Sequence, residues 1–438
     1  MRFKPYPKYK SSGVEWLGHI PSNWEMTRLK RISQVRLSNV DKHSIEGQKY
    51  IRLCNYVDVY RNRRITSEIE FMTATASDEQ IARLTLSKGD VIITKDSESP
   101  SDIGVPALVN EDITNLVCGY HLALIRPMAT SGQYLCYLLM SHFVRAVFEM
   151  EATGMTRYAL GKYSIENLVT AIPPDSEQSA IASFLDCETA KIDTLIAKQE
   201  KLIELLKEKR QAIISHAVTK GLNPNVRMKD SGVEWLGEVP EHWSVVQSRR
   251  LFSERNEKAI NSDKQLTASQ KYGVIYQDQF MSLEGQKVVQ VITGSDILKH
   301  VEPGDFVISM RSFQGGIESA NDRGSISSAY VMLKPEKNVY PKFFSYLFKS
   351  RLYIQSLQRT SNLVRDGQAL RFSNFSQVSL PIVPEMEQRT IASFIDQEIA
   401  KIDTLIAKSE QAISLQKEHR TALISAAVTG KIDVRDVA

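Results

Sequence analysis

The chain has 438 residues, 42% of them hydrophobic and 24% charged, a composition typical of a globular protein long enough for two or three domains. No run of about 18 apolar residues could span a membrane, and no apolar signal-peptide core opens the sequence, so we expect a cytoplasmic protein. The net charge is +4, but residues 1–64 carry +9 and the remainder −5. A basic N-terminal part suits contact with a polyanion, although a solvated basic face would look the same.

Each half of the chain opens with the same aromatic segment. KSSGVEWLGHIPSNW at 10–24 returns as KDSGVEWLGEVPEHW at 229–243. Tryptophan is mainly a packing residue, so we expect these segments to be pinned onto helices through Trp16, Trp24, Trp235 and Trp243. A binding role is the alternative, and Trp16 and Trp235 are candidates for docking a partner.

The bodies that follow, residues 25–176 and 244–386, share only a sparse scaffold. The matching parts are a Gly-Asp turn with an apolar strand, a second strand, an aromatic helix and a closing loop: 86–97 and 301–312, 121–127 and 329–335, 134–148 and 342–357, 154–162 and 362–371. A short strand and a proline end each body. Short β-branched strands with one or two helices predict an α/β or α+β domain.

A long helix is predicted at the end of each half. Residues 177–219 return at 387–429 without a gap, and 29 of the 43 positions are identical. Neither copy contains Gly or Pro, and both are rich in good helix formers. Apolar residues form a heptad-like stripe on the first copy: Leu185, Ile192, Leu195, Ile196, Leu202, Ile203, Leu206 and Ile213. Each helix would be about 60 Å long, and two matching stripes most simply pack on each other.

The helices repeat closely, whereas the polar loops of the bodies differ. A duplicated protein keeps the parts that meet the same partner and diversifies the parts that meet different targets. Polar positions on the helices therefore predict partner docking: Lys191, Asp193 and Lys198, repeated as Lys401, Asp403 and Lys408. The predicted organisation is 1–24 opening segment, 25–176 first body, 177–220 central helix, 221–243 second opening segment, 244–386 second body, 387–430 C-terminal helix and 431–438 tail.

No catalytic motif is recognisable in the sequence. GMTRYALGKY at 154–163 is not a P-loop, no G-x-G-x-x-G is present, and the histidines, including His121 and His142, lack metal-binding spacing. Cys54, Cys118, Cys136 and Cys187 share no C-x-x-C spacing, so we expect reduced thiols. The chain is therefore predicted to be non-catalytic.

The pattern resembles a known family, the DNA-specificity (S) subunits of Type I restriction–modification systems. SGVEWLG followed by Ile-Pro or Val-Pro and then Trp, at both repeat starts, carries the resemblance, together with P-x-x-E-Q before each long helix, at Pro174–Gln178 and Pro384–Gln388. The resemblance covers essentially the whole chain.

The resemblance implies two α/β (α+β) target recognition domains, each reading half of a split DNA site. It also implies that the two long helices form an antiparallel coiled coil with an internal pseudo-two-fold repeat. Two methylation subunits with S-adenosylmethionine would dock on this frame, and restriction subunits with ATP and Mg²⁺ would join outside them. The chain itself would hold no cofactor. Two rivals stay open: a coiled-coil adaptor that binds only proteins, and a nuclease or methyltransferase in its own right.

The divergent polar loops are the predicted DNA contacts. In the first body they are Arg61, Arg63, Arg64, Lys95, Asp96, Ser97, Thr156, Arg157 and Tyr158; in the second they are Ser269, Gln270, Arg311, Ser312, Gln314, Arg365, Gln368 and Arg371. Lys and Arg contacts to phosphates would fix the register, and bidentate side chains would read base edges. Replacing Arg157 or Arg311 by Ala should cost about 1–3 kcal/mol at one base position if that residue reads a base.

Overall fold

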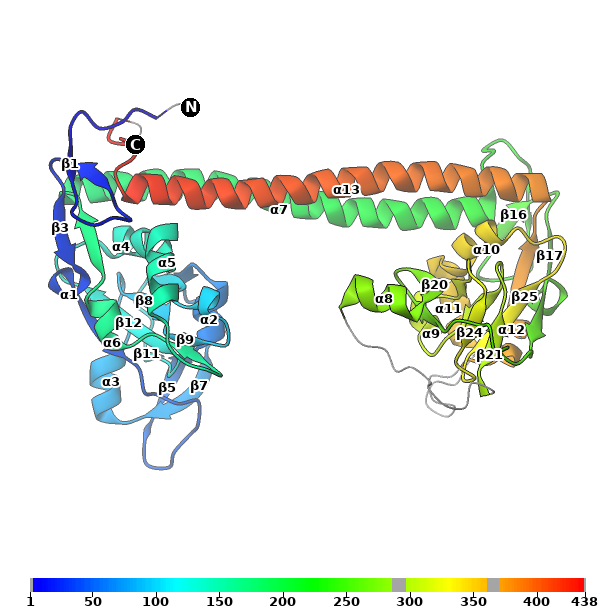
Figure 1. Cartoon of the computed structure of the whole chain (residues 1–438), viewed down its shortest axis with the longest axis horizontal. Coiled ribbons are helices and arrows are strands. Elements are labelled where there is room, and N and C mark those ends of the chain that lie inside the picture. The colour runs from blue at the N-terminus through cyan, green and yellow to red at the C-terminus, as the bar shows by residue number, and fades with distance from the viewer. Residues whose placement is uncertain (1–2, 286–296, 361–369, 437–438) are drawn as a thin grey trace. The chain divides into compact units, whose positions relative to one another are not determined.

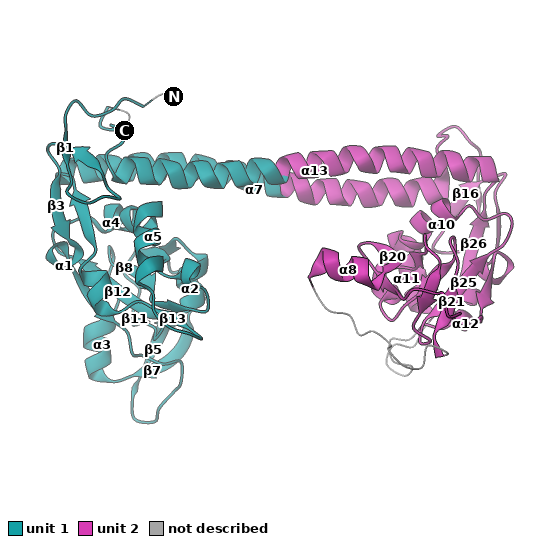
Figure 2. Cartoon of the chain, viewed as in Figure 1, with its two compact units in different colours: residues 1–200, 410–438 teal, residues 201–409 magenta. Residues whose placement is uncertain are grey.

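The fold is taken from a computed structural model, which describes residues 3–285, 297–360 and 370–436 (Figure 1). The chain forms two compact units, and each is described separately (Figure 2). Unit 1 comprises residues 1–200 and 410–438, and unit 2 comprises residues 201–409. Each unit therefore contains one opening segment, one body and a part of each long helix.

The two long helices are α7 (Asp175–Lys220) and α13 (Glu385–Val428). Each begins two residues earlier than the repeat at 177 and 387 predicts. Carboxylates in the first turns, from Asp175 and Glu177 or from Glu385 and Glu387, lie where the helix dipole favours negative charge. Glycines with positive φ follow both ends, Gly221 at 73° and Gly430 at 71°, the usual C-terminal stop for a helix.

The body of unit 1 contains two sheets that contribute to a common hydrophobic core. A five-stranded sheet has the order β4 (Ser33–Leu37), β12 (Leu122–Pro127), β8 (Val91–Thr94), β10 (Pro106–Val109) and β6 (Arg64–Ile65); a three-stranded sheet has the order β11 (Leu116–Cys118), β5 (Lys49–Cys54) and β7 (Met72–Ala76). Val91 and Ile93 face one core, and Ile92 between them faces the other. The run Val91, Ile92 and Ile93 in β8 is therefore apolar because both faces of the strand are covered.

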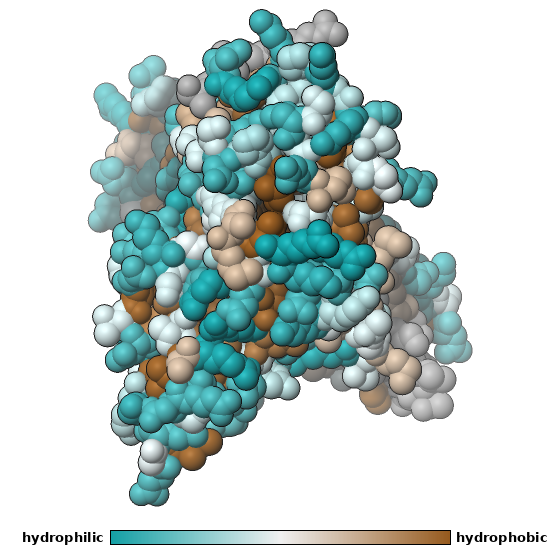
Figure 3. Space-filling model, turned by 90° about the vertical axis from the view of Figure 1, so that its left-hand side faces the viewer, coloured by the Kyte–Doolittle hydropathy of each residue, from teal (hydrophilic) through white to brown (hydrophobic). Residues whose placement is uncertain are grey.

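Two-stranded pairs and short helices complete unit 1. The two-stranded pairs are β1 (Tyr9–Ser11) with β2 (His19–Pro21), β3 (Glu25–Arg28) with β14 (Val169–Ile172), and β9 (Asp96–Ser97) with β13 (Tyr158–Ala159). The helical segments are α1 (Leu29–Ile32), α2 (Tyr56–Arg61), α3 (Asp78–Leu84), η1 (Pro100–Asp102), α4 (Gly132–Met140), α5 (His142–Glu151) and α6 (Lys162–Glu166). The face of the molecule in Figure 3 is largely hydrophilic, with apolar side chains in small separate groups.

The body of unit 2 is smaller in its sheet and richer in aromatic packing. Its four-stranded antiparallel sheet has the order β18 (Phe252–Arg255), β25 (Val331–Pro335), β22 (Phe306–Ile308) and β23 (Glu318–Ser319). The ring of Phe252 lies 5.3–5.6 Å from those of Phe306, Phe344, Phe348 and Phe375. Such edge-on and tilted aromatic pairs add to the stabilisation that burial alone provides.

Two-stranded pairs and short helices surround this sheet. The pairs are β15 (Met228–Asp230) with β16 (Glu238–Pro240), β17 (Ser244–Gln247) with β26 (Ser379–Ile382), β19 (Leu266–Ser269) with β20 (Gly273–Tyr276), and β21 (Lys299–Val301) with β24 (Gly324–Ile326). The helical segments are η2 (Ser248–Arg250), α8 (Gln277–Glu284), α9 (Ser312–Gly315), α10 (Pro341–Phe348), α11 (Arg351–Arg359) and α12 (Phe372–Gln377).

The single aromatic helix predicted in each body is in fact two helices. The chain breaks between α4 and α5 at Ser141 and between α10 and α11 at Ser350. Each serine takes an extended conformation and its hydroxyl accepts a bond from the backbone N–H three residues on, at Val144 or Tyr353. This is the N-cap role that serine favours over a place inside a helix.

The repeated Glu-Gln pair at the start of each long helix holds the opening segment and the body. The Trp24 indole N–H donates to Glu177 at 2.8 Å, and the Trp243 indole N–H donates to Glu387 at 3.1 Å. The following Gln residues, Gln178 and Gln388, accept backbone N–H bonds from Ser131 and Tyr340. The expectation that the opening tryptophans pack on helices is thus confirmed for this pair, and both side chains are fully buried.

A second set of contacts ties each body to the helices. In unit 1 the Tyr137 hydroxyl donates to Asp186 of α7 at 2.5 Å. In unit 2 the Tyr346 hydroxyl donates to Asp396 of α13. These pairs stand at matching places in the two repeats, so each body meets its helix through the same chemistry.

The two long helices also contact each other within each unit. In unit 1, Arg420 of α13 donates to Asp193 of α7 at 2.6 Å; in unit 2, Arg210 of α7 pairs with Asp403 of α13. The aspartates and the arginines are repeat equivalents, so the same ion pair forms twice with the helices exchanged. Asp193 and Asp403 remain 40% and 53% exposed in these ion pairs, so their predicted role in docking a partner stays a prediction.

The apolar stripe of α7 is narrower than the sequence predicts. Leu185, Ile192 and Ile196 are buried in unit 1, but Leu195 is 46% exposed and Leu202 in unit 2 is 42% exposed. A heptad count places all of them on one face, whereas a straight helix turns about 100° per residue and drifts away from that count. No described helix is long and apolar enough to cross a membrane.

Candidate nucleic-acid interface

The two loops predicted to contact DNA in unit 1 lie against each other. The first follows strand β8, and its residues Asp96 and Ser97 form strand β9; the second contributes β13. Asp96 is paired with Ala159 and Ser97 with Tyr158, and the Leu160 N–H donates to the Lys95 carbonyl at 2.7 Å. Segments some 60 residues apart in sequence thus form one surface.

Lys95, Arg157 and His121 converge on the buried carboxylate of Asp96. The Lys95 Nζ donates to Oδ2 at 2.9 Å, and the His121 Nδ1 lies 2.6 Å from Oδ1, although not in hydrogen-bond geometry. The Arg157 Nε lies 3.8 Å from the same Oδ1. We call Lys95, Asp96, His121 and Arg157 the Asp96 cluster.

Aromatic side chains border the Asp96 cluster. The Lys95 ammonium lies 4.7 Å from the centre of the Tyr120 ring, a cation–π distance, and Tyr120 is exposed. The rings of Tyr56 and Tyr60 on α2 are stacked at 5.6 Å, and the Tyr56 hydroxyl donates to Ser97. Cations beside exposed rings are a combination common on surfaces that bind nucleic acids.

Sequence reasoning missed Tyr120 and His121, and it treated His121 as a core or surface residue. Both directly precede β12. The only signal was an aromatic pair where a buried strand begins, beside a Gly-Asp strand in the repeat. Their place beside Lys95 follows from the pairing of β12 with β8, because Tyr120 and His121 precede β12 and Lys95 directly follows β8.

Other residues predicted in the first body lie in different places. Arg63 donates to Asp193 at 2.8 Å and Arg64 to Asp186 at 2.7 Å, so these two guanidinium groups hold the body on α7. They are not part of the Asp96 cluster. Arg61 is exposed at the end of α2, and Thr156 is exposed in the closing loop.

In unit 2 the predicted loops also meet, around a different chemistry. The Gln270 amide donates to the Arg311 carbonyl at 3.2 Å, which joins the loop after β19 to the turn before α9. Ser269 is the last residue of β19. Arg311 and Gln314 are exposed. Ser312 is buried, and its hydroxyl accepts the Ser309 N–H at 2.9 Å; the prediction that Ser312 contacts DNA is therefore corrected, because the side chain has no route to the surface.

Lys349 joins this surface and was not predicted. Its Nζ donates to the Gln270 carbonyl at 3.1 Å and pairs with Glu318 at 2.7 Å. Burial raises the pKa of Glu318, and the Lys349 ammonium opposes that rise. Arg371 is exposed at the start of α12, whereas the predicted Arg365 and Gln368 lie outside the described residues.

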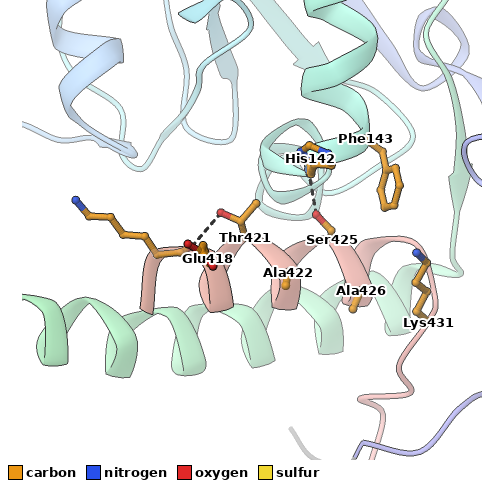
Figure 4. A pocket seen from close by; sticks show the side chains of 9 residues that line it. His142, Phe143, Glu418, Thr421, Ala422, Ser425, Ala426 and Lys431 are labelled. Carbon is orange, nitrogen blue, oxygen red and sulfur yellow. Dashed lines mark hydrogen bonds between the residues drawn. The ribbon is translucent and has the colours of Figure 1, made fainter. Parts of the chain in front are cut away.

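Each unit has a surface hollow where its body meets a long helix, and the two hollows differ in the side chains that line them. In unit 2, polar side chains surround a hollow of about 390 Å³: Gln211, Gln314, Lys349, Arg351, Gln355 and Gln358, with Ile354. In unit 1, a groove of about 550 Å³ lies between α5 and α13, with Phe143 on one side and Ala422 and Ala426 on the other (Figure 4). There the His142 N–H donates to the Ser425 hydroxyl at 3.0 Å.

The residues predicted to dock a partner fall into three groups. Trp235 is buried, and its indole donates to the Ser379 carbonyl at 3.1 Å, so the docking prediction is corrected there. Trp16 is half-buried and stacks on Phe143. The lysines are exposed: Lys191 and Lys401, each paired with a glutamate one turn before it, and Lys198 and Lys408.

Exposed leucines recur at equivalent places on the long helices. Leu195 and Leu405 are repeat equivalents, as are Leu205 and Leu415, and all four are exposed. Of these four leucines, each unit presents one from α7 and one from α13. Apolar side chains left open at matching places are what a repeated contact with a partner would use.

No cluster of His, Cys, Asp or Glu among the described residues could hold a metal ion. All four cysteines are free. Burial raises the pKa of Cys54, Cys118 and Cys136, which makes these thiols poor nucleophiles.

Comparisons with known proteins agree with this architecture. Over 425 residues the chain is 24% identical to a putative type I restriction enzyme MjaX specificity subunit of Methanocaldococcus jannaschii, covering 96% of each chain. It is 30% identical over 141 residues to the type I restriction enzyme EcoKI specificity subunit of Escherichia coli, covering 30% of each.

Two solved structures share the fold. The HsdS subunit of Thermoanaerobacter tengcongensis matches with a TM-score of 0.52 at 16% identity, covering 94% of this chain and 98% of that one. A chain from a study of complex assembly and conformational transition of a type I R-M system matches with a TM-score of 0.66 at 15% identity, covering 93% and 98%. The model of the Type I restriction modification DNA specificity domain matches twice, at residues 21–205 and 240–415. The chain therefore belongs to the family of Type I restriction–modification DNA specificity proteins, and it carries two copies of the domain.

Proposed function

We propose that the chain is the specificity subunit of a Type I restriction–modification complex, in which each body reads one half of a bipartite DNA site. One observation carries the proposal. The contacts that fasten the bodies are repeated, Trp24 with Glu177 as Trp243 with Glu387, whereas the surfaces around Asp96 and Arg311 differ. We call these repeated contacts between body and long helix the mount. Two readers of different half-sites require the same mount and different surfaces toward DNA.

The long helices are proposed to form an antiparallel coiled coil with a pseudo-two-fold axis. The exchanged ion pairs support this, because a two-fold interface makes each contact twice with the partners reversed. Two readers would then face DNA with opposite polarity, and helix length would set the gap between half-sites. One added helical turn should move the readers apart by about 5 Å, more than one base-pair step.

Two methylation subunits, which bring S-adenosylmethionine, are proposed to dock on the helix region. The exposed leucines at equivalent positions, Leu195 with Leu405 and Leu205 with Leu415, support two equal docking places. Lys198 and Lys408 are proposed as their polar neighbours. Restriction subunits with ATP and Mg²⁺ would join this assembly in the cytoplasm, and the chain itself would contribute no catalysis and hold no cofactor.

Specific DNA contacts are proposed for the surfaces around the Asp96 cluster and Arg311. Arg61, Thr156 and Tyr158 extend the first, and Ser269, Gln270, Gln314 and Lys349 extend the second. Long cations such as Arg371 are proposed to contact phosphates, which fixes register but carries no sequence information. Arg63 and Arg64 belong to the mount and are not proposed as DNA contacts.

The test is to express the chain with its methylation subunit and map modified adenines across the host DNA. Two short half-sites around a fixed unspecified gap are expected, and replacing residues 244–386 with another body should change one half only. A continuous motif, or methylation that does not depend on this chain, would contradict the proposal. Failure to bind DNA in the presence of the methylation subunit would favour a protein-binding adaptor instead.

A further inference from the structure

We infer that the Asp96 cluster reads a guanine in the major groove, with Arg157 and Lys95 as the reading groups and Asp96 as the residue that positions them. The inference rests on the proposed function of the first body as a DNA reader. It goes further by naming the base class and the side chains, which a family resemblance does not supply.

Arg157 of the Asp96 cluster keeps hydrogen-bond donors that no other residue described by the structure occupies. Arg157 is 51% exposed and touches Asp96 only through Nε, at 3.8 Å. Its guanidinium donates no hydrogen bond to any residue in the described ranges, 3–285, 297–360 and 370–436. The two terminal amino groups can therefore point outward as a fork. Two donors in a fork match the O6 and N7 acceptors of guanine, a pattern that the other base pairs do not present there.

A structural ion pair in the same body shows the difference. Arg126 donates to both oxygens of Asp90, at 2.8 and 2.6 Å, and also to the Thr85 carbonyl. The hydrogen bonds of that guanidinium stabilise the Gly-Asp turn. The Asp96 carboxylate instead lies beneath cations that keep donors to spare.

The Asp96 cluster fixes the direction of its hydrogen-bond donors more than it concentrates positive charge. Lys95 is 14% exposed, held by Asp96 at 2.9 Å and by the Tyr120 ring at 4.7 Å. A buried carboxylate under these cations weakens their attraction for any phosphate. It also fixes their geometry, and a bidentate base contact depends on fixed geometry more than a phosphate contact does. The cost of burying Asp96 is therefore consistent with base reading.

The equivalent position in unit 2 carries different residues. In the paired segments 86–97 and 301–312, the place of Lys95 is taken by Met310 and the place of Asp96 by Arg311. Among the residues that the structure describes, Arg311 has no ion-pair partner, and the buried carboxylate of this second surface, Glu318, pairs with Lys349 instead. The two bodies share the strand that presents the surface, and they differ at the residues inferred to read bases.

The experiment uses the full chain, expressed with its methylation subunit, and maps modified adenines for the native chain, Arg157→Ala and Asp96→Asn. The half-site assigned to residues 25–176 should contain a fixed guanine. Arg157→Ala should lower the preference for guanine over the other bases at that position by roughly ten- to hundredfold relative to the native chain. Asp96→Asn should relax the same position, because its neighbours lose their direction. Arg31→Ala, at an exposed arginine on α1, is the matched control and should leave the motif unchanged.

Three results would overturn the inference while leaving the proposed function intact: no guanine in that half-site, an unchanged motif with Arg157→Ala, or an equal loss at all sites, which marks a phosphate contact. If Asp96→Asn fails to assemble with the methylation subunit, Arg157→Lys decides, since it keeps the charge and loses the fork. A native chain without a bipartite motif would contradict the proposed function itself.

Discussion

Unit 1 and unit 2 differ most where they face outward and least where a body meets the helices. The equivalent contacts, unit 1 first, are Trp24–Glu177 and Trp243–Glu387, Tyr137–Asp186 and Tyr346–Asp396, Arg420–Asp193 and Arg210–Asp403. The bodies themselves have a five-stranded and a three-stranded sheet in unit 1, and a four-stranded sheet with a phenylalanine cluster in unit 2. Duplication has thus kept the mount and altered what is mounted.

Removing the buried tryptophans should break the comparison most strongly. Trp24→Ala and Trp243→Ala each delete a fully buried ring and its bond to a glutamate, so each should cost about 3–5 kcal/mol. Because the mounts are equivalent, the two losses should be similar, and each should appear first in its own unit. Hydrogen exchange resolved by segment measures this. Tyr50→Ala, at a side chain 74% exposed, is the control and should change little.

Exposed leucines should matter for assembly and not for folding. Leu195→Ser and Leu405→Ser each remove an apolar contact of about 1.5–3 kcal/mol if that side chain is buried by a methylation subunit. Each variant should weaken assembly roughly tenfold or more, and the double variant should weaken both docking places. Titration with the methylation subunit measures the affinity, and an unchanged melting temperature controls for folding. Unaltered assembly by the double variant would remove these residues from the docking surface.

The helix ion pairs sharpen the comparison because unit 1 has one contact more. Asp193 accepts bonds from Arg420 and from Arg63 of the body, whereas the only ion-pair partner of Asp403 among the described residues is Arg210. All these side chains are partly exposed, so solvent screening keeps the effects small. Asp193→Ala should cost roughly 1 kcal/mol and Asp403→Ala a few tenths, by denaturant unfolding. Equal losses would show that Arg63 contributes nothing.

A pH effect should be confined to unit 2. The His300 ring faces Asp263 at 2.7 Å and Glu302 at 2.8 Å, with Arg323 beside both carboxylates. Burial alone lowers the pKa of His300, but bonds to Glu302 and Asp263 outweigh it and raise the pKa above 6.5. The position equivalent to His300 in unit 1 is Thr85, which does not titrate.

The raised pKa of His300 fixes the direction of the effect. The stabilisation is fully present below about pH 6.5, the pKa of the unfolded chain. It is lost as the pH rises through the higher folded-state pKa, by about 1.4 kcal/mol per pKa unit of difference. Segment-resolved hydrogen exchange from pH 6 upward should show unit 2 weakening, and His300→Gln should flatten the curve. A matching change in unit 1 would assign the effect to something other than His300.

The sequence predicts the frame well because repetition is visible without a structure. Two repeated stretches free of Gly and Pro indicate long helices, and the Glu-Gln pairs at their starts mark both boundaries. The breaks at Ser141 and Ser350 were missed, because serine is tolerated inside helices and only the backbone shows that it caps one. The stripe was predicted too wide, since apolar spacing alone does not place Leu195 and Leu202 inside or outside.

The surfaces were predicted less well, for a physical reason. Charge tells which side chains can bind an anion, but it does not tell which internal carboxylate claims them first. Arg63 and Arg64, predicted as DNA contacts, form ion pairs with α7, and Asp193, predicted to dock a partner, pairs with Arg420. The loops around Lys95 and Arg157 were identified from their divergence between the repeats. Tyr120 and His121 became visible only once strand pairing placed them beside Asp96.

The most direct test of the shared mount is a chain with the first body in both places. Residues 25–176 are put in place of 244–386, between Trp243 and Glu387, where Asp396 and Asp403 can accept the bonds that Tyr137 and Arg63 make in unit 1. Expressed with the methylation subunit, this chain should direct methylation to an inverted repeat of a single half-site. A chain that assembles but modifies an asymmetric motif would contradict the account, because the two mounts would then not be equivalent.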